Sequence, residues 1–338
     1  MEGESTWACK TMCAREGQGM ENLSLLVNSE DTPSLLTSEW EDAVIDYSER
    51  HLTYGTDRLP ALSGFARRFQ DRSQWEYMAG LWLSGFPACL AWYRRSSGVG
   101  PSLNNSVPSW SWASVSHGVF WPPENSYQPI LKSCQLADIR CRPSTENRFG
   151  EVEKGSYTEL TGMVIDAEME CDNHGCGSVT CRGFRSCPLI PDCLLISETT
   201  KINNVSEGED PKSILDAERK AGIEGGQQAR IHRAKPQDQT RIEDPQFRMS
   251  RIKGPVICLL LYTKECNSQQ IVPRILILGA KSAQHGENDV YERLGFAGPT
   301  LSLNKNSHGW EDWESLNWDW NEWEGWFEGA EERTLRIE

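Results

Sequence analysis

The sequence predicts an α+β fold, with N-terminal helices over about residues 38–94 packed on a β-rich C-terminal part over about 108–338. Two observations predict this arrangement. Apolar residues recur at three- and four-residue spacing in the first range, whereas in the second they alternate or form short continuous runs. A chain of 338 residues that is 38% hydrophobic and 25% charged is long enough to bury the core that such a fold needs.

The first helix is expected to begin near Ser38, because Ser38 and Glu41 have the spacing of a capping box. Residues 1–34, by contrast, show little periodicity, and we expect a disordered N-terminal tail there. Three apolar residues recur at helical spacing and share one face of the first helix: Trp40, Val44 and Tyr47.

Two further helices complete the expected helical region, residues 35–107. Asp57 can cap a helix that runs to residue 69. A third helix is expected over about 74–93, with Gly80 and Gly85 permitting close packing and Pro87 dividing it. The second helix has an apolar stripe of Leu59, Leu62, Phe65, Ala66 and Phe69.

Short runs rich in β-branched and aromatic residues predict strands after residue 108. The runs 256–262 and 274–278 are nearly continuous in apolar residues, which predicts burial on both faces and a hairpin across the polar loop 263–272. Residues 291–296 are expected to follow as another strand, with Arg293 pointing away from the core. The other candidate strands are 160–165, 194–197 and 334–337.

The β-rich domain, residues 108–200 and 254–308, is expected to be interrupted by a disordered insertion over 201–253. This segment has a single aromatic residue, Phe247, against nine acidic and eleven basic residues. We expect it to bury too little apolar area to offset the entropy lost on ordering.

The formal charge of -15 is uneven, since residues 309–338 hold ten acidic side chains and two arginines, a net charge of -8. An acidic chain repels phosphate backbones, so we expect no nucleic-acid partner. The first residues lack the basic and apolar features of a secretory signal, and the longest apolar run is too short to span a bilayer. We expect a cytoplasmic protein without a membrane span, whose twelve cysteines remain thiols.

Aromatic residues concentrate in three runs: Tyr77-Met-Ala-Gly-Leu-Trp82, Leu90-Ala-Trp-Tyr-Arg94 and Pro108-Ser-Trp-Ser-Trp-Ala-Ser114. In the last run Trp110 and Trp112 alternate with small residues, which predicts a short strand with both indoles on one face. Such indoles can line a recognition pocket, but packing in a core is the favoured interpretation.

Three more segments flank these runs in order. Upstream are Trp40-Glu-Asp-Ala-Val-Ile-Asp-Tyr-Ser-Glu-Arg50 and Asp57-Arg-Leu-Pro-Ala-Leu-Ser-Gly-Phe-Ala66, and downstream is Tyr291-Glu-Arg-Leu-Gly-Phe296. Together these pieces resemble the C-terminal part of fungal heterokaryon-incompatibility (HET-domain) proteins, over about residues 35–123 and 255–298. The Leu-Ser-Tyr-x-Trp-Gly and Trp-Ile-Asp-x-Leu-Cys-Ile-x-Gln motifs of the HET domain are missing from this sequence. We therefore expect the region that accompanies a HET domain, without that domain.

The resemblance implies a role in fungal non-self recognition, which ends in programmed cell death when hyphae of different strains fuse. We expect a non-catalytic regulatory or interaction region that contacts a protein partner, with a HET-domain protein as one candidate. TIR-like relatives of HET domains imply an alternative, an enzyme that cleaves NAD, but the carboxylate it needs would belong to the missing domain. We therefore expect no catalytic residue and no cofactor in this chain.

A cysteine-rich run supports a further alternative, a zinc-dependent adaptor built on residues 171–193. Thiolates and imidazoles at close spacing can build a tetrahedral zinc site. Their spacing here departs from the paired knuckles of structural zinc sites, which favours a surface loop of free thiols. The candidate ligands are Cys171, His174, Cys176 and Cys181.

Residues 309–338 form an acidic, tryptophan-rich tail, expected to be a helix followed by a short strand. On the helix, one apolar stripe faces away from the acidic side chains and could anchor the tail in a groove of a partner protein. The favoured alternative is that the stripe covers the protein's own core. The interaction candidates on this stripe are Trp313, Trp320, Trp323 and Phe327.

Overall fold

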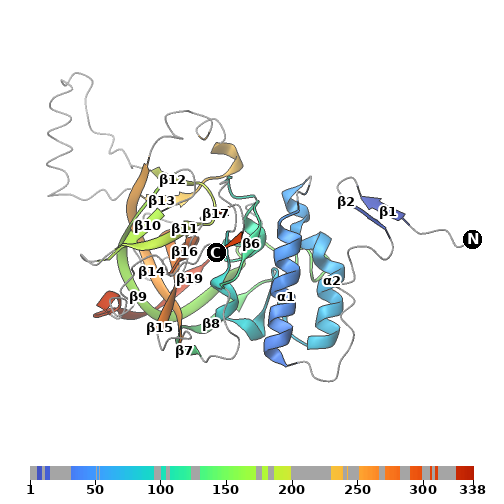
Figure 1. Ribbon diagram of the computed structural model, residues 1–338, viewed down its shortest axis with the longest axis horizontal. Helices are drawn as coiled ribbons and strands as arrows, with labels where there is room; N and C mark the ends of the chain where they lie inside the picture. Colours follow the sequence, from blue (N-terminus) through green and yellow to red (C-terminus); the bar gives the residue numbers. More distant parts are fainter. Residues whose placement is uncertain are drawn as a thin grey trace, which may run out of the picture.

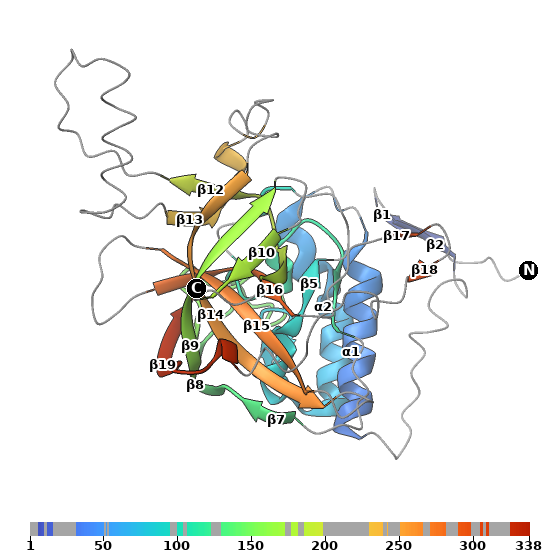
Figure 2. The ribbon, with the colours of Figure 1, turned by 60° about the vertical axis from the view of Figure 1, so that its left-hand side comes forward.

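The fold is α+β in the broad sense and consists mostly of strands. Two helices lie side by side along one side of a strongly curved sheet (Figure 1), and a view turned by 60° shows the same two layers (Figure 2). The computed structural model describes residues 6–9, 12–15, 32–50, 52, 54–94, 100–103, 107–122, 130–172, 177–181, 186–198, 230–238, 242, 251–265, 271–281, 290–298, 305–306, 309–310 and 325–338.

Helix α1 (Pro33–Ser48) begins before Ser38, so the predicted capping box is wrong. Thr32 occupies the N-cap, and its Oγ1 accepts a hydrogen bond from the Leu35 N–H at 3.4 Å. Pro33 suits the first turn, where a backbone N–H would have no partner within the helix. The predicted buried face is confirmed for Trp40, Val44 and Tyr47.

Helix α2 (Arg58–Ser73) follows the 3-10 turn η1 (Gly55–Asp57) and confirms the second predicted helix. Asp57 occupies the N-cap position, although its side chain makes no capping hydrogen bond. The helix ends at Gln74, which has a left-handed backbone with φ 58°. Its buried stripe consists of Leu59, Leu62, Ala66 and Phe69, with Phe65 half-buried beside it.

The helix predicted over 74–93 is wrong. Ala79 and Gly80 both have positive φ, 45° and 92°, which is the backbone of a two-residue hairpin turn. The apolar spacing of this run suits a hairpin as well as a helix, and the turn decides between them. The segment comprises β3 (Tyr77–Met78), β4 (Leu81–Trp82), the 3-10 turns η2 (Leu83–Gly85) and η3 (Ala88–Ala91), and β5 (Tyr93–Arg94), which pairs with β6 (Val119–Phe120).

The strand predicted at Trp110 and Trp112 is also wrong. The chain makes a turn there and continues as the 3-10 turn η4 (Trp112–Ser114). Ser111 starts it, because its Oγ accepts a hydrogen bond from the Ala113 N–H at 3.1 Å. Both indoles are nevertheless fully buried, so the favoured prediction of core packing is confirmed.

The main sheet closes on itself. The ring runs β9–β14–β15–β16–β11–β10 and returns to β9, with every pair in the ring antiparallel. Within the described segments the sheet comprises β7 (Ile130–Ser133), β8 (Gln135–Arg140), β9 (Tyr157–Asp172), β10 (Gly177–Thr180), β11 (Cys187–Pro191), β14 (Arg251–Glu265), β15 (Ile271–Ala280), β16 (Val290–Ala297) and β19 (Glu331–Ile337).

Alternate residues of the central strands face two different cores. The inner core is the buried cluster to which every strand of the ring contributes, and the outer core is the cluster that the ring shares with α1 and α2. In β15, Ile275 and Ile277 belong to the inner core, whereas Leu276 and Leu278 belong to the outer core. This double burial confirms the prediction from the continuous apolar runs, and β14 and β15 form the predicted hairpin.

The disordered insertion predicted over 201–253 is wrong for the residues described there. Strand β13 (Arg230–Arg233) pairs with β12 (Leu195–Glu198), the 3-10 turn η5 (Pro236–Asp238) follows, and β14 already begins at Arg251. The β13 segment is ordered despite its polar composition because Ile231 and Ala234 are buried and Arg233 donates to the buried Ser109 carbonyl oxygen.

The two ends of the chain also differ from expectation. β1 (Thr6–Cys9) pairs with β2 (Met12–Arg15) inside the stretch 1–34, where a disordered tail was expected, and α1 starts there too. β17 (Lys305–Asn306) pairs with β18 (Gly309–Trp310). The predicted C-terminal strand is confirmed by β19, while residues 311–324, which hold most of the predicted tail helix, lie outside the described residues.

Neither α1 nor α2, nor any other described helical turn, is long and apolar enough to cross a membrane.

Candidate functional site

A fully buried ion pair lies where the helical layer meets the closed sheet. Arg293 on β16 and Asp192, which follows β11, both have side chains with no solvent exposure. The Arg293 Nε donates to Asp192 Oδ2 at 2.8 Å and Nη2 donates to Oδ1 at 3.2 Å, so the guanidinium grips both carboxylate oxygens. The pairing fixes the angle between the two side chains as well as their separation.

The same guanidinium also binds the aromatic-rich segment. Nη1 donates to the Leu90 carbonyl oxygen at 2.7 Å, and Nη2 donates to the Trp92 carbonyl oxygen. The Arg293 Cζ atom lies 3.4 Å from the centre of the Trp92 ring, in the position of a cation–π contact. One side chain therefore joins β16, the chain after β11 and the end of η3.

The prediction that Arg293 points away from the core is wrong. Arg293 lies two residues after Tyr291, so both face the outer core. Beyond it the β15–β16 register shifts, from Leu278 opposite Arg293 to Ile277 opposite Gly295. The bulge adds one residue to the alternation, so the side chain of Phe296 points to the outer core. Tyr291, Arg293 and Phe296 therefore all face the outer core.

A second buried arginine, Arg233 on β13, continues the network. Its Nε donates to Cys193 Sγ at 3.3 Å, and its Nη1 donates to the Ser109 carbonyl oxygen at 3.2 Å. Nη2 donates to Ser114 Oγ at 3.0 Å, and the Arg233 backbone N–H donates to Glu292 Oε1 at 2.9 Å. Arg233 thus connects the segment 109–114 to β16 from the opposite side.

Three buried arginines face two buried carboxylates in this junction: Arg94, Arg233 and Arg293 against Asp192 and Glu292. Arg94 donates from Nε to the Pro191 carbonyl oxygen at 3.1 Å. Burial raises the pKa of the Asp192 carboxyl, and the neighbouring guanidinium groups of Arg293 and Arg233 act in the opposite direction. Burial also lowers the pKa of Arg293, and Asp192 opposes that shift. Both oxygens of the Asp192 carboxylate accept hydrogen bonds from Arg293, and the role of this side chain is to hold a cation in place.

The segments that carry the HET resemblance contact one another around this junction. Ser109 Oγ accepts from the Arg293 backbone N–H at 2.9 Å, and Ser111 Oγ donates to the Ala79 carbonyl oxygen at 2.6 Å. Trp92 Nε1 donates to the Trp110 carbonyl oxygen at 3.0 Å. Each serine or indole satisfies a backbone group that the irregular turns leave without a ladder partner.

Gly80 is the point where three of these segments meet. Its carbonyl oxygen accepts from Trp112 Nε1 at 2.7 Å and from Trp40 Nε1 at 3.1 Å. A Cβ at this position would lie 2.5 Å from Trp112 Nε1. The absence of a side chain at Gly80 is therefore what lets the indole reach the carbonyl.

Arg58, at the start of α2, is held beside the same indole. Its Cζ lies 5.5 Å from the Trp112 ring centre, and the Tyr47 hydroxyl donates to the Arg58 carbonyl oxygen at 2.9 Å. Burial lowers the pKa of Arg58 to about 10, with the Tyr47 phenol opposing that shift. The upstream segments of the resemblance, which contain Tyr47 and Arg58, thus join the same cluster.

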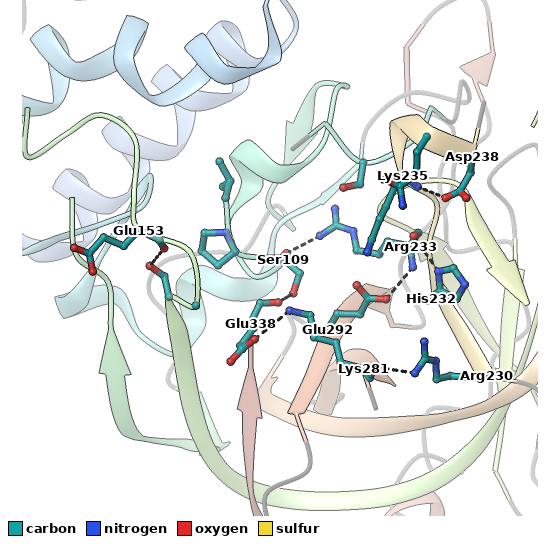
Figure 3. Close-up of a pocket in the computed structure, with 16 residues that line it drawn as sticks. Ser109, Glu153, Arg230, His232, Arg233, Lys235, Asp238, Lys281, Glu292 and Glu338 are labelled. Carbon is teal, nitrogen blue, oxygen red and sulfur yellow. Dashed lines mark hydrogen bonds and ion pairs between the residues drawn. The ribbon is translucent and has the colours of Figure 1, made fainter. Parts of the chain in front are cut away.

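A polar cavity of about 340 Å³ borders the junction on the side of β13 (Figure 3). Arg233, Glu292 and Ser109 belong to both its wall and the junction. Its remaining lining comes from the chain between β5 and η4, from the chain before β9, from β13 with η5, and from the residues that end or follow β15 and β19.

The zinc candidates are only partly described. Cys171 at the end of β9 and Cys181 after β10 are buried in the inner core, while His174 and Cys176 lie outside the described residues. Burial raises the pKa of Cys171 to about 12. Among the described side chains, no group of three or more His, Cys, Asp or Glu is placed to hold a metal ion.

The interaction candidates of the tail are likewise divided. Trp313, Trp320 and Trp323 lie outside the described residues. Phe327 is buried in the inner core together with Trp326, as the favoured alternative of core covering predicted.

Sequence reasoning missed Asp192, Arg233 and the junction itself. Arg233 lies in a polar segment, and Asp192 follows a strand with no motif around it. The only available signal was the arginine inside the otherwise apolar run 291–296, since a charge in a buried strand needs a buried partner.

Comparison with protein-family models, with curated proteins and with solved structures finds no match for this chain.

Proposed function

We propose that this chain is a non-catalytic interaction and regulatory region of a HET-type protein, which takes part in fungal non-self recognition and programmed cell death through contact with a protein partner. The observation that carries the proposal is that the segments with the HET resemblance bind one another inside the molecule. Their indoles, serines and arginines bind one another inside the molecule, as between Arg293, Trp92 and Ser109. Side chains that are committed to internal bonds do not act on a substrate, so this arrangement favours a scaffold that presents a surface to a partner.

The charged groups support the same interpretation. A catalytic acid or base must reach the atom whose proton it moves. Asp192, by contrast, has no solvent exposure and has both oxygens bound by Arg293. Arg293 in turn directs its bonds to protein acceptors from two separate segments, Asp192 after β11 and the Leu90 and Trp92 carbonyls at the end of η3.

A regulatory role requires two states that a partner binds with different affinity. The junction offers such an element, because directed bonds from Arg293 and Arg233 join the aromatic-rich segments to the closed sheet in addition to the packing of the outer core. A partner that favours the joined arrangement would stabilise it, and one that favours a separated arrangement would release it. The proposal places the protein in the cytoplasm, where thiols such as Cys187 and Cys258, both free here, stay reduced.

The test is partner capture followed by reconstitution. The tagged full chain is immunoprecipitated from a fungal host, and a HET-domain protein is expected among the captured proteins. Direct binding is then measured between the two purified proteins by calorimetry. Recovery of no HET-domain protein, or capture that purified components fail to reproduce, contradicts the proposal.

The tail candidates sharpen that test. Trp320→Ala is expected to weaken binding of the purified partner by about tenfold if the tail is the anchor. Tyr54→Ala is the matched control, because Tyr54 is an exposed aromatic residue far from the tail in sequence.

Incubation of the purified chain with NAD separates the proposal from the enzymatic alternative. No release of nicotinamide above a protein-free control is expected. Release that depends on the chain would show catalysis and overturn the proposal.

A further inference from the structure

The outward face of the helical layer is acidic on one helix and basic on the other. Helices α1 and α2 lie side by side along the sheet, with their buried stripes towards it, so their opposite sides point to solvent (Figure 1). The exposed charges within α1 are Asp42 and Asp46, a net charge of -2. Those within α2 are Arg67, Arg68 and Asp71, a net charge of +1.

The charges in the middle of this face have no partner in the chain. Within the described residues, no side chain forms an ion pair with Asp42 or with either arginine. Asp46, by contrast, pairs with Arg50 at 2.6 Å. The exposed Glu49 and Asp57 lie at one end of the layer, where α1 ends and α2 begins. One carboxylate and two guanidinium groups in the described part of the face are therefore available to another molecule.

These three groups lie at about the same height along the layer. The Trp40 ring on α1 packs on Phe65 and on Phe69 of α2, with ring centres 5.7 and 5.3 Å apart. The turn of α2 between those two rings contains both arginines, so both lie level with Trp40. Asp42 follows two residues later on α1, a rise of about 3 Å. The opposite charges thus form one band across the two helices.

A band of this kind is complementary to a second copy of itself. A two-fold axis parallel to the helices places α1 of one copy on α2 of the other and keeps the heights equal. Asp42 of each copy then faces Arg67 and Arg68 of the other copy. An axis across the helices at the height of the band would instead place Asp42 near Asp42, a like-charge contact. The charge pattern therefore selects the first arrangement.

We propose that the outward face of α1 and α2 binds a second copy of this chain through contacts of Asp42 with Arg67 and Arg68. Leu35 lies two turns before Asp42 on the same side of α1 and is 59% exposed, so it adds apolar area that a copy covers. The inference does not depend on the proposed partner contact, because the second copy is itself the partner here.

The size of the face sets the expected strength of this contact. A helix of 16 residues is about 24 Å long, and two such helices about 8 to 10 Å apart present roughly 500 Å². A standard interface buries about 800 Å² on each partner. We therefore expect a weak and reversible dimer, with a dissociation constant in about the micromolar range.

The first experiment is sedimentation of the full chain over a range of protein concentrations. A reversible equilibrium between monomer and dimer is expected at about 50 mM sodium chloride. At about 500 mM the dissociation constant should rise at least about tenfold, because salt screens exposed charges. A chain that is monomeric at every concentration, or a dimer that salt does not weaken, overturns the proposal.

Charge reversal locates the contact. Arg68→Glu and Asp42→Arg are each expected to weaken dimerisation at least about tenfold, because the symmetry places like charges together twice in each dimer. Asp42→Arg adds two positive units to the formal charge of -15 and gives -13, which by itself would favour association. A loss of dimer in this variant must therefore come from the local contact.

Lys253→Glu is the matched control for Arg68→Glu, since it changes the net charge by the same amount. Lys253 is 59% exposed on β14 and pairs with Glu168, outside the helical layer. If Arg68→Glu lowers the melting temperature, Arg67→Glu replaces it. Dimerisation that either reversal leaves unchanged, or that Lys253→Glu weakens as strongly, overturns the assignment to this face.

Mixing the two reversal variants is the most specific experiment. In the mixed dimer, Asp42 of the Arg68→Glu variant faces the native Arg68 of the other copy, and the two substituted positions face each other with opposite charges. The mixture is expected to dimerise with an affinity within about threefold of that of the parent chain, although each variant alone does so poorly. A mixture that dimerises no better than the separate variants contradicts the proposed pairing.

Discussion

The outer core, between the helices and the sheet, is filled by large aromatic side chains, whereas the inner core contains mainly aliphatic side chains and thiols. The difference follows from the backbone around each. Turns such as 79–80 and 109–114 leave carbonyl oxygens without ladder partners, and indole N–H groups reach them. Around the inner core the strands satisfy one another, so side chains there need only fill volume. Four of the described tryptophans thus hold irregular backbone in one conformation: Trp40, Trp92, Trp112 and Trp121.

The largest expected effect is loss of the buried ion pair at the outer core. Asp192→Ala leaves the Arg293 guanidinium buried without its counter-charge and is expected to lower the free energy of unfolding by about 3 to 5 kcal/mol. Chemical denaturation followed by circular dichroism measures the change. Glu170→Ala is the control, because the Glu170–Arg251 pair is exposed and is worth about 0 to 1 kcal/mol. Equal losses for the two variants would remove the distinction between the junction and the surface.

The next effect concerns the turn beneath Trp112. Gly80→Ala places a Cβ at 2.5 Å from the indole nitrogen in a residue with φ 92°, and is expected to cost about 2 to 3 kcal/mol. Gly64→Ala is the matched control with the opposite sign. Gly64 lies within α2 with nothing within 4 Å of the added Cβ, so alanine should stabilise by about 0.5 to 1 kcal/mol. Thermal melts of both variants measure the pair, and a stable Gly80→Ala protein would contradict the role of this turn.

Alkaline pH tests the thiols of the inner core. Burial raises the pKa of Cys171 and of Cys187 to about 12 each. The unfolded thiols ionise above about pH 8.5 while the folded ones stay protonated, so this contribution to stability is complete below pH 8.5 and is lost as pH rises towards 12. The expected loss is about 1.4 kcal/mol for each thiol per pH unit in that window. Melting temperatures at pH 7.5 and 9.5 should differ less in Cys171→Ala and in Cys187→Ala, and an unchanged difference would count against buried protonated thiols.

The smallest effect is a volume change within the inner core. Ile277→Val removes one methylene from a site surrounded by aliphatic side chains and is expected to cost about 0.5 to 1.5 kcal/mol. Trp92→Phe in the outer core should cost more, because it also removes the N–H bond to Trp110 and weakens the contact with Arg293. Urea denaturation compares them, and a smaller loss for Trp92→Phe would reverse the contrast between the cores.

The sequence sufficed to locate the strands that are buried on both faces. The runs at 256–262 and 274–278 are nearly continuous in apolar residues because alternate side chains enter different cores, and this pattern is visible without a structure. α2 was visible for a similar reason, since its stripe from Leu59 to Phe69 has a single period.

The junction could not be predicted because none of its causes is local. Asp192 and Arg293 are 101 residues apart, and a register shift in β16 decides which way the strand beyond Arg293 faces. The supposed helix at 74–93 failed for a related reason: positive φ at Ala79 and Gly80 is stabilised by the contacts of Trp112 and Trp40 from elsewhere in the chain. The aromatic motifs were visible, but which carbonyl each indole serves was not.

A double-mutant cycle between Asp192 and Arg293 is the most direct test of the claim that this pair joins the two layers. The free energy of unfolding is measured for the parent chain, for Asp192→Asn, for Arg293→Met and for the double variant. A coupling free energy of about 2 to 3 kcal/mol is predicted, with the double variant far more stable than the sum of the single losses implies. Losses that add within about 0.5 kcal/mol would contradict a coupled pair at the junction.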